Sequence, residues 1–202
     1  MTPATLHGPR TTLRVWTEAD LAPFAALNAD AEVMRWFKAP LTREQSDSMA
    51  ARIRANLALN GHGLWALQTP ELEFAGFVGL FPALGFDLPD EPAFQRFKAT
   101  RPDEIGWRLA RAAWGHGYAT EAAKLALDHA LQARRLPQVV SFTTLGNVRS
   151  QAVMQRIGLQ PVGEFDHPNL AGHALQRHVL YATPEPPRAV QSFTPMPCKD
   201  QR

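Results

Sequence analysis

A segment that reads as strand, turn and helix, "WRLARAAWGHGYATEAAKLALDHA" at residues 107–130, constrains the fold more than any other. Gly115 and Gly117 flank one histidine, and beyond Tyr118 small apolar residues and charged residues separate onto opposite faces at helical spacing. Such a turn would aim several backbone N–H groups and the positive end of the helix at one point, which suits a phosphate. A plain tight turn between a strand and a helix explains the two glycines equally well.

Two familiar nucleotide-binding turns do not fit this spacing. No Lys-Ser or Lys-Thr pair follows the second glycine, as a P-loop requires. Thr120 stands where the dinucleotide fingerprint needs its third glycine.

The rest of the chain predicts an α/β (α+β) domain at residues 1–183. Strand patterns, some of them alternating and some rich in β-branched residues, predict seven strands, at residues 12–16, 64–69, 74–83, 103–110, 137–145, 161–165 and 175–182. Helix signals predict helices that start at Thr17 or Asp20, after Thr42 with an end near Gly61, from about Tyr118, and from Asn147 to Gly158. Residues 82–102 lack a clean period and are predicted to form a long loop, and a loop of that length in a compact domain is often functional. The proline-rich residues 184–202 are predicted to be a disordered tail.

Composition narrows the function classes. The net charge is only +2, and the lone dense basic cluster is the pair Arg134 and Arg135, so we expect no nucleic-acid partner. Cys198 is the single cysteine, which leaves no intrachain disulfide and no cysteine metal cluster. No signal peptide and no membrane helix is apparent, so we expect a cytoplasmic protein without a membrane partner.

Several motifs in a fixed order resemble the GNAT N-acetyltransferases, in particular their RimJ/RimL-like branch. The run "EIGWRLARAAWGHGYATEAA" looks like the acetyl-CoA-binding core of that family, and "VVSFTTLGNVRSQAVMQRIGL" looks like its next strand and an Asn-x-x-Ser helix start. The resemblance continues through "GEFDHP" and "HVLY" and covers about Thr12 to Ala182. It implies a GNAT fold, in which a central mixed, twisted sheet of about seven strands is flanked by helices on both faces.

The resemblance also implies a binding site for acetyl-CoA. Strand-like backbone would hold the pantetheine arm of acetyl-CoA, and the turn would take its pyrophosphate. The residues implied in cofactor binding are Trp107, Arg108, Leu109, Trp114, Gly115, His116, Gly117, Tyr118, Ala119, Thr120, Asn147 and Ser150. Trp114 stands where the wider superfamily has Gln or Arg.

The helix start "NVRS" has two readings. Asn147 and Ser150 form an N-cap and an exposed serine in the plainer one. The family reading sets Asn147 against the pantetheine amides and Ser150 near the thioester sulfur, where its hydroxyl could protonate the departing thiolate.

Acetylation of an amine also needs a base, for which the sequence offers two candidates. One is Glu104 at the head of its strand, and the other is His167 held by Asp166. Both have structural alternatives: Glu104 as the anchor of a loop and His167 as a turn residue before Pro168. Trp36 and Phe37 lie on the connection that lines the acceptor cleft in this family, and no histidine pair has metal-ligand spacing, so we expect no metal.

We therefore expect an enzyme that moves acetyl from acetyl-CoA to a primary amine by direct attack in a ternary complex. The alternatives are a non-catalytic acetyl-CoA-binding module and a transferase of a different acyl group. A protein N-terminus, a polyamine, an amino acid and an amine antibiotic all remain open as acceptors, since fold and cofactor do not fix the substrate. The sequence leaves monomer and homodimer equally open.

Overall fold

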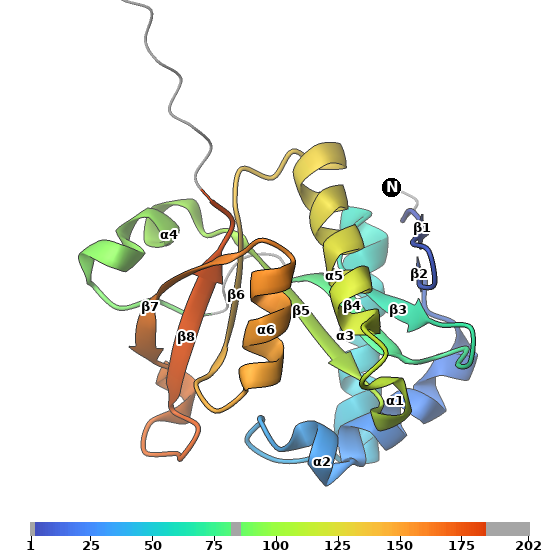
Figure 1. Cartoon of the computed structure of the whole chain (residues 1–202). Helices are drawn as coiled ribbons and strands as arrows, with labels where there is room; N and C mark the ends of the chain where they lie inside the picture. The colour runs from blue at the N-terminus through green and yellow to red at the C-terminus, as the bar shows by residue number, and fades with distance from the viewer. Residues whose placement is uncertain (1–2, 82–85, 185–202) are drawn as a thin grey trace, which may run out of the picture.

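The computed structural model describes residues 3–81 and 86–184, and its centre is one eight-stranded sheet (Figure 1). The strand order is β1-β2-β3-β4-β5-β6-β8-β7, and every neighbouring pair is antiparallel except β5 and β6. The strands are β1 Leu6–His7, β2 Thr12–Arg14, β3 Leu64–Gln68, β4 Gly76–Phe81, β5 Asp103–Leu109, β6 Val139–Thr144, β7 Gln160–Asp166 and β8 Arg177–Ala182. The expected mixed α/β fold is confirmed, with the short β1 added at one edge.

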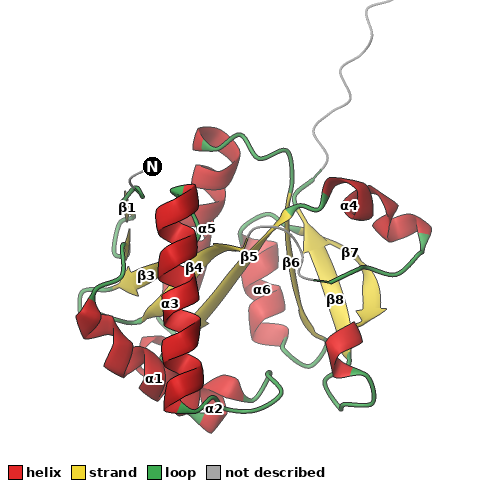
Figure 2. Cartoon of the chain, turned by 180° about the vertical axis from the view of Figure 1, so that it is seen from behind, coloured by secondary structure: helices red, strands yellow, loops and turns green. Residues whose placement is uncertain are grey.

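Helices cover both faces of the sheet. They are α1 Leu21–Ala29, α2 Ala31–Met34, α3 Arg43–Asn60, α4 Gln95–Thr100, α5 Tyr118–Asp128 and α6 Val148–Arg156. Helices α5 and α6 contact each other on one face, and α1 and α3 contact each other on the opposite face, as Figures 1 and 2 show from the two sides. The arrangement follows from the predicted helix signals: Thr42 and Gln45 form a capping box at the start of α3, and Gly61 ends it at φ 70°.

The sheet opens between β5 and β6. Their parallel pairing is limited to Asp103 with Val139 and Glu104 with Val140, whereas β4 and β5 pair from Glu104 to Leu109. Beyond Glu104, the outer edge of β5 is therefore not covered by β6. The candidate functional site lies at this opening.

The face of α5 toward the sheet is built from small side chains, as predicted. Ala122, Ala126 and Ala130 are fully buried. Ala133 was expected on the same face but is exposed, because the π-helical turn His129–Ala133 is wider than an α-turn and carries it away.

The predicted loop at residues 82–102 contains a short helix, so the loop prediction is wrong over part of that range. The turn Pro92–Phe94 leads into α4, and Phe94 and Phe97 are buried in a second hydrophobic cluster with Phe165 and Leu180. Tertiary burial of the two phenylalanines stabilises a helix that its own sequence pattern does not reveal. Residues 82–85 and almost all of the predicted tail, from residue 185 onward, lie outside the described residues.

No helix in the described part of the chain is both long and apolar enough to cross a membrane.

Candidate acetyl-transfer site

One large cavity collects most of the residues singled out in the sequence. Its volume is about 1640 Å³, and it extends from the glycine turn past the edge of β5 to the α1–α3 side of the sheet. The predicted residues that line it are Trp36, Phe37, Glu104, Trp107, Arg108, Leu109, Trp114, Gly115, Gly117, Tyr118, Ala119, Thr120, Asn147, Ser150 and His167. His116 and Asp166 do not line it.

The turn before α5 depends on its two glycines. Gly115 has φ 83° and Gly117 has φ 81°, in the left-handed region that side chains disfavour. A β-carbon on Gly115 would meet no protein atom within 4 Å, so backbone conformation rather than protein crowding requires glycine there. The turn delivers the chain into the N-terminus of α5 at Tyr118, whose free N–H groups favour an anion.

Four arginines that were not predicted from the sequence also line the cavity: Arg10, Arg35, Arg149 and Arg156. Arg10 pairs with Glu121 at 2.9 Å and donates to the backbone oxygen of His116 at 3.0 Å, which ties the N-terminal segment to the turn. Arg149 lies 5.5 Å from the centre of the Trp114 ring. They add positive charge to a site that already presents a helix N-terminus, so the site suits a polyanion.

The outer edge of β5 presents backbone groups toward the opening. The amide of Ala110 donates to Ala75 beside β4, and the carbonyl of Ile105 accepts from Ser141 on β6. Because backbone groups alternate along a strand, the N–H and C=O of Trp107 face away from β4, into the opening. The carbonyl of Leu109 faces the same way but already accepts from the Trp114 indole at 2.9 Å.

Asn147 and Ser150 meet at the start of α6. The Asn147 side chain caps the helix by accepting from the Ser150 amide at 3.3 Å. Its amide nitrogen also donates to the Ser150 hydroxyl at 3.0 Å and to the Thr143 hydroxyl at 2.9 Å. Since the Ser150 oxygen accepts from Asn147, its own hydrogen remains able to point into the cavity.

Glu104 is the most perturbed acid of the cavity. It is half-buried at the border of the cavity, and loss of hydration raises its pKa to about 8. The side chains of Glu104 and Arg108 lie on the same face of β5 as Gly106, because residues two apart share a face. The Phe81 ring lies over Gly106, where a β-carbon would be 3.2 Å from the ring and 3.7 Å from a carboxylate oxygen of Glu104.

The predicted pair of Asp166 and His167 does not form. Successive residues of a strand point to opposite faces, and the exposed Asp166 contacts Arg177 at 3.4 Å instead. His167 packs among aromatic rings, with its ring centre 4.4 Å from that of Phe86 and the two rings tilted by 41°, and burial together with His178 lowers its pKa. Its Nδ1 accepts from the Asn169 amide at 3.2 Å, so the neutral ring carries its proton on Nε2 and offers no free base there.

Trp36 and Phe37 line the cavity from the connection between α2 and α3. Trp36 contacts Gly146 so closely that a β-carbon there would lie 2.9 Å from the indole ring. Phe37 is 41% exposed and lies under the guanidinium of Arg108, with 4.0 Å from its ring centre to the guanidinium carbon.

Comparison with known proteins decides the family. Residues 10–160 match the family described as "Acetyltransferase (GNAT) domain". The chain belongs to the GNAT acetyltransferases.

Individual relatives agree with this membership. The chain is 28% identical over 152 residues to the uncharacterized protein YkkB of Bacillus subtilis, covering 74% of this chain and 81% of YkkB. It is 31% identical over 144 residues to FsC-acetyl coenzyme A-N(2)-transacetylase of Aspergillus fumigatus, covering 69% of this chain and 57% of that relative. A structure of RimJ from Mycobacterium smegmatis in complex with CoA-disulfide has the same fold, with 21% identity, a TM-score of 0.69, and coverage of 90% of this chain and 89% of RimJ.

GNAT enzymes use acetyl-CoA, and the site has what that cofactor requires. The left-handed glycines, the N-terminus of α5 and the arginines of the cavity suit its phosphates, and the open edge of β5 suits its amide-bearing pantetheine arm. Among the described residues, no group of three His, Cys, Asp or Glu side chains could hold a metal ion.

Proposed function

We propose that the protein transfers acetyl from acetyl-CoA to a primary amine by direct attack in a ternary complex. One observation carries this proposal: Glu104 and Ser150 enter the same cavity from opposite faces of the sheet, at the place where β5 and β6 separate. A base and an acid on opposite sides of one reaction centre is what this transfer requires. The name of the Aspergillus relative, an N(2)-transacetylase, supports an amine as the acceptor.

Glu104 is the proposed base. An amine arrives as an ammonium ion, and a carboxylate with a pKa near 8 accepts its proton far more readily than an ordinary glutamate does. The acceptor cation would in turn favour the charged form of the Glu104 carboxyl. His167 is the weaker candidate, because its lone pair at Nδ1 is already used.

Ser150 and the β5 backbone complete the proposed machinery. Acetyl-CoA supplies a thioester, whose carbonyl carbon gains a bond to the amine nitrogen while its bond to sulfur breaks. The Trp107 amide faces the opening and can donate to the carbonyl oxygen. The Ser150 hydroxyl, oriented by Asn147, can donate its proton to the sulfur that leaves.

Calorimetric titration with acetyl-CoA, CoA, longer acyl-CoAs and NAD tests the proposed acetyl-CoA binding site. We expect selective binding of CoA compounds in the micromolar range, about −8 kcal/mol. A tighter fit for a longer acyl chain would favour the alternative donor.

Release of free CoA thiol on addition of amines tests transfer itself. We expect kcat/KM to rise with pH toward about 8, and Glu104→Gln to lower kcat by about 100-fold while acetyl-CoA affinity stays unchanged. Tight acetyl-CoA binding without thiol release for any amine would favour a non-catalytic binding module.

A further inference from the structure

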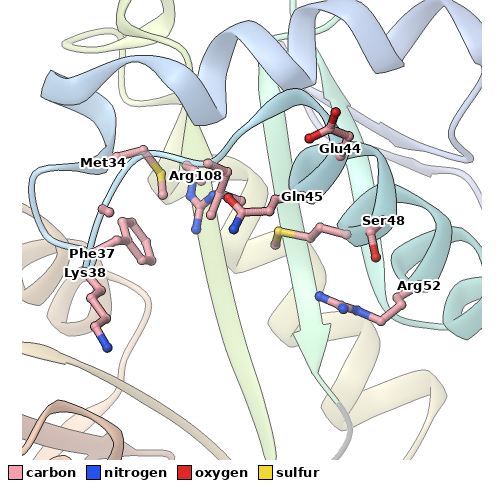
Figure 3. Close-up of a pocket in the computed structure, with 11 residues that line it drawn as sticks. Met34, Phe37, Lys38, Glu44, Gln45, Ser48, Arg52 and Arg108 are labelled. Atoms are coloured by element: carbon pink, nitrogen blue, oxygen red, sulfur yellow. The ribbon is translucent and has the colours of Figure 1, made fainter.

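A second, smaller cavity on the α1–α3 side of the sheet holds a buried cation without an anion. This cavity has a volume of about 600 Å³, and it shares Phe37, Lys38, Met49 and Arg108 with the large cavity (Figure 3). Arg108 projects from β5 between the segment that carries Phe37 and Lys38 and the helix α3, which carries Gln45, Ser48 and Arg52 (Figure 3). Only 8% of Arg108 is exposed.

The charge of Arg108 is not neutralised within the described part of the chain. Its Nη1 donates to the side-chain oxygen of Asn28, a neutral partner, and its Nε is buried without any hydrogen-bond partner. The guanidinium otherwise contacts the faces of Phe37 and Phe77, 4.0 Å and 5.4 Å from the ring centres. A buried cation that lacks an anionic partner is costly, and burial lowers the pKa of Arg108 to about 10.

A hydrogen-bond chain holds this cation in place. Asn28 on α1 is fully buried and donates to Ser46 on α3 at 2.8 Å, while its oxygen accepts from Arg108. The chain Ser46–Asn28–Arg108 therefore fixes one side of the guanidinium and leaves the buried Nε–H unused. A fixed guanidinium with unused N–H groups is the arrangement that binds carboxylate or phosphate oxygens.

The charged residues around the cavity also favour an anionic ligand. Lys38 and Arg52 are exposed at its rim, and among the described residues neither forms an ion pair. Glu44 is the one acid lining it among the described residues, and it forms no ion pair with Arg108. Three cations against one acid would attract an anion and repel a polyamine.

We propose that Arg108 binds an anionic group at the far end of the acceptor, which makes the substrate an amine that also carries a carboxylate or a phosphate. This inference rests on the transfer proposed above, with the amine at Glu104. The two residues stand four positions apart on one face of β5, about 13 Å between their Cα atoms. The acceptor therefore separates its amine from its anion by several bonds.

Acceptors that differ only in their far end test this. We would compare 6-aminohexanoate, 6-aminohexanamide, 1,6-diaminohexane and 6-aminohexyl phosphate by thiol release. We expect kcat/KM for an anionic acceptor to exceed that for the amide by 10-fold or more, with the diamine lowest. The better of the acid and the phosphate identifies which anion the site takes.

Variants assign the preference to Arg108. Arg108→Met should reduce the ratio of acid to amide to about 1, and Arg108→Lys should keep part of it. Arg43→Met is the control, since Arg43 is exposed, pairs with Asp47 and lines neither cavity. Wild-type enzyme that does not distinguish acid from amide, or an unchanged ratio in Arg108→Met, would overturn the proposal.

Binding separates this inference from the proposed activity. The Arg108 Nε–H gives its own signal in a proton–nitrogen NMR spectrum, assigned by its absence in Arg108→Lys. With CoA present, the product analogue 6-acetamidohexanoate or 6-acetamidohexyl phosphate should shift this signal, and 6-acetamidohexanamide should not. If no amine is acetylated but the anionic product analogues shift the signal, the proposed acetyl transfer is refuted and the proposed anion site at Arg108 is supported. If none of the anions shifts it, the anion site is refuted whatever the turnover.

Discussion

At the scale of single residues, Glu104 couples the site to the stability of the fold. In the folded protein its pKa is about 8, whereas an exposed glutamate has a pKa of 4.5. Between these two pH values the folded state holds a proton that the unfolded state has lost. Folding is then linked to proton uptake, so this residue makes the free energy of unfolding fall as pH rises from 4.5 toward 8.

Glu104→Gln tests this coupling without any substrate. Glutamine cannot ionise, so the difference in free energy of unfolding between wild type and the variant isolates the effect of the Glu104 proton. As pH rises from 4.5 toward 8, the wild-type free energy of unfolding should fall relative to that of the variant by up to about 1.4 kcal/mol for each pH unit. Urea unfolding at several pH values from 4.5 to 8.5 measures the difference. Glu91→Gln, at an exposed position, serves as the control for the loss of one glutamate charge. A difference for Glu104→Gln that changes with pH no more than the difference for Glu91→Gln would show that the Glu104 carboxyl is not desolvated.

Only some of the residues of the candidate site could be predicted from the sequence. Local motifs were enough to select Glu104, Asn147 and Ser150, which the structure places in one cavity. The sequence selected Arg108 only for its backbone, because its buried guanidinium depends on Asn28, eighty positions away. An arginine directly after the apolar run "IGW" of strand β5 was the available signal.

At the scale of elements, the turn into α5 requires glycine because of its backbone conformation. Gly117 has φ 81° and Gly172, in the turn before β8, has φ 75°. A β-carbon would meet only Arg10, at 3.6 Å, in the first case and nothing within 4 Å in the second. Alanine at either position therefore carries mainly a conformational cost, about 1–2 kcal/mol.

The two glycines should differ in their effect on acetyl-CoA. Gly117→Ala should weaken acetyl-CoA binding by 10-fold or more, because the methyl group enters the turn proposed to hold the pyrophosphate, and larger side chains should abolish binding. Gly172→Ala should lose similar stability but keep its affinity. Thermal unfolding and calorimetric titration of both variants measure the two effects. Equal affinities would move the phosphate away from this turn.

The same scale shows where sequence patterns predict elements well. Capping residues and periodicity located α3, α5 and α6, because those signals lie within a few residues of the helix they define. Helix α4 was missed because Phe94 and Phe97 form it by packing against β7 and β8, which follow more than 60 residues later. The separation of β5 from β6 is likewise a property of the sheet and has no signature in either strand.

At the scale of the whole molecule, the sheet consists of two parts joined at a short seam. Strands β1 to β5 form one part and β6 to β8 the other, and only two residue pairs join them in register. A ligand that hydrogen-bonds along the open edge of β5 would replace the missing strand there. Cofactor binding and the rigidity of the sheet should therefore be linked.

Amide hydrogen exchange along β5 can reveal this link. The Trp107 amide faces the opening, whereas the Arg108 amide faces β4, which pairs with β5 along its whole length. Acetyl-CoA should slow hydrogen exchange of both amides, and the slowing at Trp107 should exceed the slowing at Arg108 by 10-fold or more. A ligand that acts only by stabilising the folded state would protect both equally, by at most about 2.7 kcal/mol at 100 times its Kd. Equal protection would place the cofactor away from the β5 edge, whereas a difference confined to Trp107 would place it in the seam between the two parts of the sheet.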